Sequence, residues 1–452
     1  MKIYDVIIIG AGVVGTAIAR RLSRYKLNIA LLEKETEPAF GVSKSNSGII
    51  HPGTQNPPHS LKGKLCVQGN RLIRGISREL GVDFRETGEL IIIFSETDLP
   101  RLIQLKEDAR ILGVPRLKIV RRDWLAEYEP NLSSEAVAAL YAPTAGIISP
   151  YRLVYALAEN ALRNGVELYT QAKVTGIVPV GQAKQTNFFE IQTSTGVFRT
   201  RYLVNAAGLF ADEVAGLAGV HDFCIYPRKG EEFILDKKRE HLTNHLLFPL
   251  PSPVSKGILV IKTADGNPML GPSAEDCGDK EDLATSDEGL KKVLAGAQRM
   301  IPALRQSDII AYFAGLRPVA GDDFIIRYEK TVPGLVTVAG IQSPGLTAAP
   351  AIALLVCNIL NKNGLSLTRK AVFHPHRKKT AHLFGEPLPR AKKLIKKDPA
   401  YGDMVCRCEL VSAGEIRDAI RQGAKTLDGI KFRTRAQAGR CHGSFCATRI
   451  MK

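Results

Sequence analysis

The sequence lacks an uninterrupted apolar run of the eighteen or so residues that cross a membrane. The best stretch, residues 346–360, is shorter and contains Pro350 and Asn358. No charged and then apolar leader precedes the first strand, so we expect no signal peptide and a cytoplasmic protein. Eight cysteines in 452 residues do not indicate a disulfide scaffold. Four are scattered, and we expect small buried apolar residues at Cys66, Cys224, Cys277 and Cys357.

Acidic residues are scarce near the C-terminus. Residues 369–452 contain 20 Lys and Arg but only seven Asp and Glu, and residues 390–397 are the densest basic block. Such a block is most often a solvated face, but it can also attract an acidic partner or an anionic membrane surface. No nucleic-acid recognition motif accompanies the charge, so we expect no nucleic-acid partner. Peripheral association at the inner face of a membrane is therefore an option.

A glycine-rich turn near the N-terminus predicts a dinucleotide site. An apolar strand at residues 5–9 leads into G-x-G-x-x-G, a helix at 13–22 and a second strand at 28–32 that ends in Glu33. The glycines permit a tight turn, close approach to a pyrophosphate and packing of helix on strand. Glu33 is placed to accept hydrogen bonds from a ribose. The three glycines are Gly10, Gly12 and Gly15.

The loop at residues 41–53 is rich in small and polar residues that can approach phosphate or ring atoms closely. Its histidine, His51, is the side chain there that can exchange a proton near neutral pH, although a structural histidine is an equal alternative. The small residues that we expect at a cofactor are Ser43, Ser47 and Gly48.

Three later features are candidates for ligand contacts. A buried strand from residue 202 runs into Ala207 and Gly208, which either pass under a ligand or form an ordinary turn. Arg317, between glycine and proline, is suited to a bidentate grip on an anion, with a surface ion pair as the alternative. The turn opening the helix at 348–360 provides unpaired N–H donors, or a plain helix cap if no ligand binds.

Four cysteines near the end form a thiolate set with C-x-C and C-x4-C spacing. Four thiolates bind zinc or an iron–sulfur cluster, and structural zinc more often uses two C-x2-C pairs, so the spacing favours the cluster. We expect His442 to be a bystander and the six residues after the last cysteine to form a very short closing helix, if any. The predicted metal ligands are Cys406, Cys408, Cys441 and Cys446.

The order of elements predicts an α/β protein in which a second layer of strands interrupts the nucleotide-binding part. Strand-like segments dominate residues 221–326, which we expect to cover a ligand as a mostly antiparallel sheet. The expected domains are 1–85, 150–220 and 330–365 for the nucleotide, 86–149 and 221–329 for the substrate, 366–399 as a basic linker and 400–452 for the cluster.

Together these motifs resemble the FAD-dependent D-amino-acid-oxidase-like superfamily. Those that carry the resemblance are Gly10–Gly15 with Glu33, residues 43–51, 205–212, 227–230, 315–318 and 340–345. Its glycerol-3-phosphate dehydrogenase branch is the most similar, and the cysteine segment resembles a bacterioferritin-associated-ferredoxin-like [2Fe–2S] domain. The loop ending at His51 is also similar to that of 2-hydroxyglutarate dehydrogenases.

The resemblance implies an α/β fold with a doubly wound FAD-binding domain, an antiparallel-sheet substrate domain and a small C-terminal iron–sulfur domain. It implies an FAD-dependent dehydrogenase that oxidises a small anionic 2-hydroxy compound and passes electrons through [2Fe–2S] to a partner subunit or quinone pathway. We expect this electron acceptor to dock at the basic C-terminal region. It implies catalytic roles for His51 and Arg317. An amino-acid or amine dehydrogenase (opine, proline or sarcosine), a 2-hydroxyglutarate dehydrogenase and a non-enzymatic electron-transfer subunit stay open as alternatives. The further FAD contacts that it implies are Val174, Gly340, Gly345, Leu346 and Thr347.

Overall fold

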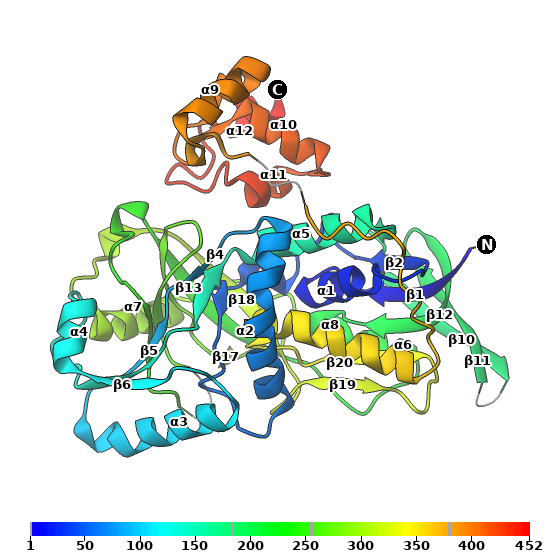
Figure 1. Cartoon of the computed structure of the whole chain (residues 1–452), viewed down its shortest axis with the longest axis horizontal. Helices are drawn as coiled ribbons and strands as arrows, with labels where there is room; N and C mark the ends of the chain where they lie inside the picture. The colour runs from blue at the N-terminus through cyan, green and yellow to red at the C-terminus, as the bar shows by residue number, and fades with distance from the viewer. Residues whose placement is uncertain (1, 183–184, 253–255, 378–380) are drawn as a thin grey trace.

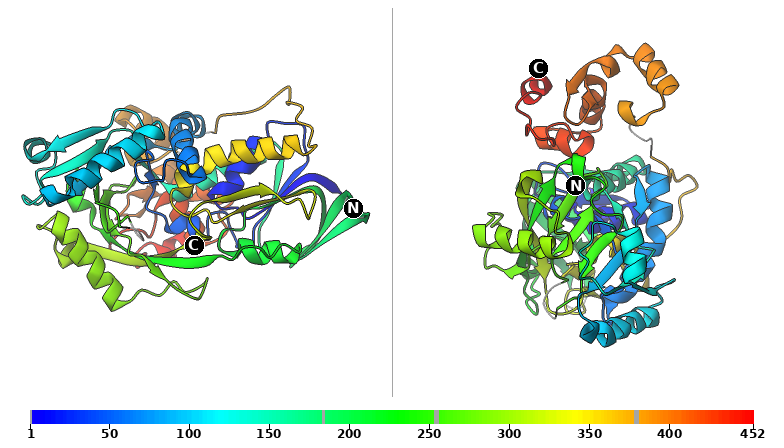
Figure 2. Two further views of the ribbon diagram at one scale, coloured as in Figure 1. Left: turned by 90° about the horizontal axis from the view of Figure 1, so that it is seen from below. Right: turned by 90° about the vertical axis from the view of Figure 1, so that its left-hand side faces the viewer.

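In the computed structural model, the chain folds into a large body made of two sheet layers and a small C-terminal domain that stands on one side of it (Figure 1). The structure describes residues 2–182, 185–252, 256–377 and 381–452. The right-hand view of Figure 2 shows the small domain, in orange and red, against one side of the body.

The first sheet has eight strands, and its centre is parallel. β1 lies between β12 and β2, β9 follows β2, and β20 pairs with the end of β12. The remaining strands join this centre in antiparallel fashion. The strands are β1 (Ile3–Ile9), β2 (Ile29–Leu32), β9 (Val166–Tyr169), β10 (Val174–Gln182), β11 (Gln185–Thr193), β12 (Gly196–Asn205), β19 (Ile325–Tyr328) and β20 (Leu335–Ala339).

Both faces of this sheet are covered, which explains why β1 is apolar from Val6 to Ile9. Val6 and Ile8 face a core formed with helices α1, α2, α5 and α8, whereas Ile7 and Ile9 face α6 and the β10–β11 hairpin. The helices are α1 (Val13–Leu22), α2 (Leu61–Leu80), α5 (Pro150–Arg163), α6 (Ala211–Leu217) and α8 (Gly345–Lys362).

Helix α8 has the length and apolar composition of a membrane-spanning helix. Most of it is buried, however, and it packs against α1 and α2 in the core of the body. Its apolar character is therefore explained by burial inside the protein.

The second sheet has nine strands and is mostly antiparallel, with one parallel pair between β14 and β5. This confirms the predicted combination of a doubly wound domain and an antiparallel one. The strands are β5 (Glu89–Ile93), β6 (Lys118–Arg121), β7 (Ala138–Ala142), β13 (Tyr226–Leu235), β14 (Leu246–Pro249), β15 (Leu259–Lys262), β16 (Pro268–Gly271), β17 (Glu275–Asp276) and β18 (Ile309–Val319).

The sequence did not predict helix α7 within the strand-rich region. Ser286 caps it by accepting a hydrogen bond from the N–H of Gly289, and Asp287 and Glu288 occupy its first turn. Val293, Ala297 and Met300 pack it onto the second sheet. The helices of this layer are α3 (Leu99–Ile111), α4 (Arg122–Tyr128) and α7 (Asp287–Met300).

A small antiparallel sheet joins the two layers and leads directly into His51. Its central strand β8 (Gly146–Ile148) pairs with β3 (Ile49–Ile50) and β4 (Phe84–Glu86). Short 3-10 turns complete the chain: η1 (Val42–Ser45), η2 (Glu96–Asp98), η3 (Gly208–Phe210), η4 (Lys237–Arg239), η5 (Gln306–Asp308), η6 (Leu383–Gly385) and η7 (Pro399–Gly402).

The segment expected to be a linker is extended in its first part and helical in its last. Thr368 and Lys370 form backbone hydrogen bonds with Lys26 and Arg24 at the end of α1, so this part runs along the body. The basic block forms helix α9 (Leu388–Lys397), which packs against η7 of the small domain. Ala391 and Leu394, one turn apart, form the partly buried face of α9. Helix α9 therefore belongs structurally to the small domain and not to a linker.

The small domain has its own apolar core, which includes Val405, Val411 and Ile416. A capping box formed by Ser412 and Glu415 starts helix α10. Two helices lie between the two cysteine pairs. The elements are β21 (Met404–Cys406), β22 (Val411–Ser412), α10 (Ala413–Arg421), α11 (Leu427–Thr434) and α12 (Ala447–Met451).

Candidate active site and cluster domain

The glycine-rich turn has no room for side chains. Gly10 has φ +100°, and a Cβ there would lie 2.4 Å from the carbonyl oxygen of Ala206. A Cβ at Gly15 would lie 1.9 Å from the carbonyl oxygen of Gly10, which allows α1 to pack on the turn. Gly12 caps α1 and lines the cavity, so the N–H groups of this helix start at a surface open to a ligand.

Glu33 lies at the end of β2 in the wall of the same cavity. Its carboxylate accepts hydrogen bonds from the N–H of Ala11 (2.7 Å) and the N–H of Glu35 (2.9 Å). Burial outweighs these two bonds and raises its pKa. The acid is thus held in place beside the glycine turn, as a ribose-binding residue must be.

The cavity has a volume of about 1000 Å³ and lies between the two sheet layers. This volume is at the upper end of the range for cofactor sites. The glycine cradle, the start of α1 and the acid fit a dinucleotide at one end, and charged side chains line the other. Twelve of the predicted site residues line it: Gly10, Gly12, Glu33, Ser43, Ser47, His51, Val174, Ala207, Gly208, Arg317, Gly345 and Leu346.

Four predicted contacts are not in the cavity lining. Gly15 allows helix α1 to pack on the glycine-rich turn, and Gly48 lies against the carbonyl of Ile148. A Cβ at Gly340 would lie 2.9 Å from the Cβ of Ala320. Thr347 is fully buried behind the cavity, where its hydroxyl accepts a hydrogen bond from the N–H of His51 at 2.9 Å. Thr347 therefore positions the histidine segment.

His51 follows β3 and is fixed by its backbone. Besides the bond to Thr347, its carbonyl accepts a hydrogen bond from Nδ2 of Asn70 at 3.0 Å. Its Nε2 lies 3.5 Å from the hydroxyl of Ser343. Burial, and secondarily the charge of Lys256, lower the pKa of the ring well below its usual value. The imidazole is neutral at physiological pH, so it is able to accept a proton.

Arg317 projects from β18 into the cavity, and its guanidinium lies against Gly230, two residues along β13 from its pairing partner Arg228. Its Nη2 donates to the carbonyl of Ser273 at 2.9 Å, and a Cβ at Gly230 would lie 2.4 Å from that nitrogen. Lys256 also lines the cavity, and burial lowers its pKa. Two cations therefore stand at the histidine end of the cavity, which suits an anionic ligand.

Sequence reasoning missed Lys256, Glu232 and Gln55, all of which line the cavity. A lone lysine before a strand carries no local signal. Glu232 carried a weak signal, since the two-residue period of a strand places it on the same face as Gly230 and Arg228.

The four predicted cysteine ligands lie together in the small domain. The Sγ atoms of Cys408 and Cys441 are 3.6 Å apart, and Cys446 is within hydrogen-bonding reach of Cys406. Gly439 permits this meeting, since a Cβ there would lie 2.4 Å from the Cβ of Cys408. Among the described residues, no group of three or more His, Cys, Asp or Glu side chains surrounds a single metal position. Two pairs of thiols suit two irons better than one tetrahedral ion.

His442, expected to be a bystander, contacts the body. Its Nε2 lies 2.8 Å from the carbonyl oxygen of Ile310 at the start of β18. The residue therefore contributes to docking of the small domain.

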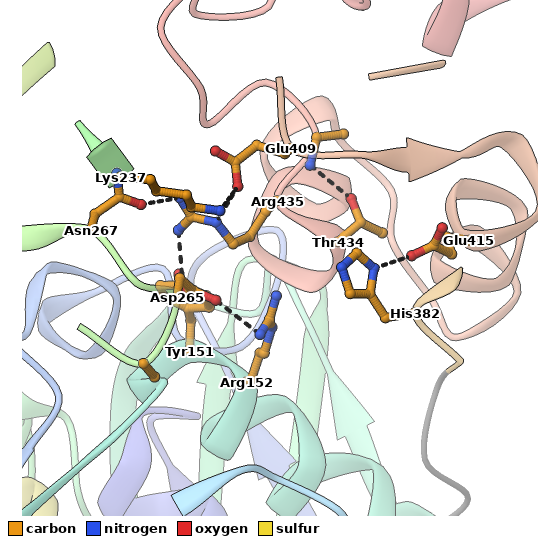
Figure 3. A network of polar contacts seen from close by, with 12 residues as sticks. Tyr151, Arg152, Lys237, Asp265, Asn267, His382, Glu409, Glu415, Thr434 and Arg435 are labelled. Atoms are coloured by element: carbon orange, nitrogen blue, oxygen red, sulfur yellow. Dashed lines mark hydrogen bonds and ion pairs between the residues drawn. The ribbon is translucent and has the colours of Figure 1, made fainter. Parts of the chain in front are cut away.

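A buried polar network holds the small domain on the body (Figure 3). Arg435, at the end of α11, donates to Glu409 (2.8 Å), Asp265 (3.0 Å) and Asn267 (2.9 Å). Asp265 also accepts a hydrogen bond from the hydroxyl of Tyr151 at 2.7 Å. Although burial opposes ionisation, Arg152 and Arg435 lower the pKa of Asp265 to about 2. The polar turn that contains Asp265 and Asn267 thus serves the domain interface.

A turn of glycines, a neutral histidine beside two cations and a four-thiol domain define a flavin-dependent oxidoreductase with its own iron–sulfur domain. Residues 5–359 match the FAD dependent oxidoreductase family, and residues 404–452 match the BFD-like [2Fe-2S] binding domain. The chain therefore belongs to the FAD-dependent oxidoreductase family, as its sequence motifs predicted, and its cofactors are FAD and a [2Fe–2S] cluster.

Several similar proteins have named activities. The chain is 40% identical to a glycerol 3-phosphate dehydrogenase of Caloramator mitchellensis, over 99% of this chain and 93% of the relative. It is 28% identical to an L-2-hydroxyglutarate dehydrogenase of Escherichia coli (strain K12), over 76% of this chain and 90% of the relative. The structure of the L-alpha-glycerophosphate oxidase from Mycoplasma pneumoniae with FAD bound is similar with a TM-score of 0.78 and 32% identity, over 83% of this chain and 99% of that one.

Proposed function

We propose that the protein is a dehydrogenase that oxidises sn-glycerol 3-phosphate, or a similar anionic 2-hydroxy compound. The observation that carries the proposal is the neutral His51 in one cavity with the cations Arg317 and Lys256. An alcohol needs a base to take its proton, and a phosphate or carboxylate needs cations to hold it. The names of the similar proteins from Caloramator and Mycoplasma support the same substrate.

Two residues of the site bind the substrate, and a third accepts its proton. Arg317 and Lys256 bind the anionic group and orient the secondary hydroxyl towards Nε2 of His51. His51 accepts the hydroxyl proton while the carbon loses a hydride. FAD supplies the hydride acceptor when bound, and the [2Fe–2S] cluster supplies a one-electron carrier.

The start of helix α8 contributes fixed partial charge. Gly345 and Leu346 line the cavity at the N-terminus of this 18-residue helix. Its unpaired N–H groups and its dipole favour negative charge at that place. They would favour an anionic ligand or an anionic ring there.

The cluster domain implies an electron acceptor outside the chain. We place its docking on the basic C-terminal region, where the four lysines of α9 form no ion pair with another described residue. A surface with this charge attracts an acidic protein or an anionic membrane surface. The protein would then work in the cytoplasm, either free or at the inner face of the membrane.

The L-2-hydroxyglutarate dehydrogenases among the relatives name a second substrate of the same chemical class. The test is the visible spectrum of the anaerobic holoprotein during additions of glycerol 3-phosphate, 2-hydroxyglutarate, lactate and amino acids. We expect glycerol 3-phosphate to bleach the flavin at the lowest concentration. Bleaching by amino acids alone would overturn the proposal, and bleaching by none of them would favour a subunit without a substrate of its own.

A further inference from the structure

Glu232 is a buried acid in the cavity wall that the mechanism above does not use. On strand β13, Arg228, Gly230 and Glu232 line the cavity. The residues between them point to the opposite face, where Glu231 accepts hydrogen bonds from the N–H and the hydroxyl of Ser286. Alternation along the strand therefore directs Glu232 to the same side of the sheet as Arg317 of the paired strand β18.

The carboxyl group of Glu232 lacks a protein partner for one oxygen. Its Oε2 is buried and forms no hydrogen bond with any described residue. Arg317 acts on this carboxyl group through its charge, and its guanidinium donates a hydrogen bond to the carbonyl of Ser273. Buried polar groups in native proteins are nearly always paired, so an unpaired one that faces a cavity indicates an atom of a ligand.

The protonation state of Glu232 indicates what kind of atom that is. Burial, partly offset by the charge of Arg317, raises its pKa to about 8. At neutral pH the group is a neutral acid that can both donate and accept a hydrogen bond. A hydroxyl group matches this, since it also does both. An ammonium group would require the ionised acid and would be repelled by Arg317.

We propose that Glu232 binds the terminal hydroxyl of the substrate and so selects a polyol phosphate over 2-hydroxy acids and amines. The inference rests on the proposed function, and it adds a specificity-determining residue to it. Gln55 is placed to assist, since it lines the same cavity and both its Oε1 and its Nε2 are buried without a partner among the described residues.

The experiment compares two substrates that differ only in this hydroxyl. sn-Glycerol 3-phosphate and 2-hydroxypropyl phosphate share the secondary alcohol and the phosphate, but the second lacks the terminal hydroxyl. A site built to pair a hydroxyl rejects the analogue without it, so we expect the holoprotein to favour glycerol 3-phosphate by about 100-fold or more in kcat/KM.

Substitutions of Glu232 test whether this residue causes the preference for glycerol 3-phosphate. In Glu232→Met, and in the smaller Glu232→Ala, kcat/KM for glycerol 3-phosphate should fall until the preference is about tenfold or less, while 2-hydroxypropyl phosphate loses about threefold at most. Glu232→Gln keeps a donor and an acceptor and should keep most of the preference. The matched control is Glu231→Gln, a buried acid on the same strand with the opposite orientation, which should leave the preference unchanged.

Three results would overturn the inference. The unaltered holoprotein could use both phosphates equally well, Glu232→Met and Glu232→Ala could lower kcat/KM equally for both, or both could retain the full preference. Equal losses would indicate a structural role, which FAD content and the melting temperature would also report. A flavin bleached by neither phosphate compound in the unaltered protein is a separate outcome, which would overturn the proposed function itself and the inference with it.

Discussion

Glu37 and Arg433 form an ion pair between the nucleotide-binding half of the body and the [2Fe–2S] domain, with side chains that are 2% and 8% exposed. Glu37 also accepts a hydrogen bond from the N–H of Lys425 at 3.0 Å, and the guanidinium of Arg433 lies over the ring of Tyr155. Glu37 follows Glu33, the acid in the cavity wall beside the glycine turn, by four residues. The segment that begins at the nucleotide site therefore also holds the cluster domain.

Removing one partner of this pair should detach the cluster domain. Breaking a buried ion pair leaves an uncompensated charge and costs about 3–5 kcal/mol. We expect Arg433→Met to expose the segment at residues 368–400 to proteolysis and to raise amide exchange in α11, while flavin bleaching by substrate persists. Arg421→Met, at an exposed pair with Asp418, is the control and should behave as the unaltered protein. Unchanged proteolysis and exchange in Arg433→Met would show that the pair does not hold the domains together.

Replacing His51 should remove the base. We expect His51→Asn to lower the rate constant of flavin reduction by about 10²–10⁴-fold, with FAD still bound, in stopped-flow measurements. Because the pKa of His51 is well below its usual value, the unaltered rate should fall only on the acid side, well below pH 6.5. A profile that instead falls as the pH rises through neutrality would contradict this role.

Glu89 should make stability depend on pH. Burial raises its pKa to about 7, and its Oε1 accepts a hydrogen bond from Thr54. Because the folded pKa lies above the unfolded value, the folded protein holds the proton more tightly. The contribution of Glu89 to stability is therefore fully present at acid pH and is lost as the pH rises from about 4.5 to 7, by about 3 kcal/mol.

The measurement is thermal unfolding of the holoprotein and of Glu89→Gln at pH 5 and pH 8. The amide cannot ionise, so the variant should gain stability relative to the unaltered protein between these two pH values. Glu96→Gln, at an exposed ion pair with Arg121, is the control. An equal change with pH in the unaltered protein and in Glu89→Gln would rule out this effect.

Removing a cluster ligand should separate the two redox steps. We expect Cys441→Ser to lose iron and the visible absorption of the cluster, while glycerol 3-phosphate still bleaches the flavin. Transfer to a one-electron protein acceptor should drop sharply, because the four-thiolate set is broken. Cys277→Ser changes a cysteine outside the small domain and should retain iron. Full iron content in Cys441→Ser would exclude this ligand set.

Local patterns explain which parts of the fold were predictable. The helix at 13–22 was predicted with its observed bounds, since hydrophobic periodicity is a local signal. Helix α7 was missed because its start signal at Ser286 lay within a region otherwise rich in strands. Helix α9 was assigned to a linker, because its charge pattern hid a narrow packed face.

The site was predictable only in part for the same reason. The glycine turn and Glu33 form a contiguous motif, so their shared position at one cavity followed from local geometry. Lys256 and Glu232 have no such motif around them. They reach the cavity only because distant strands pair in the second sheet.

The sequence by itself determined the nucleotide turn, the set of four cysteines and the two-layer class, because each depends on residues close together or on a repeated period. Only the tertiary structure decided the protonation of His51 and Glu232, since burial and neighbouring charges from other elements shift their pKa values. It also decided where the cluster domain sits, through Glu37 with Arg433 and Asp265 with Arg435. No local pattern encodes a contact between residues so far apart in the chain.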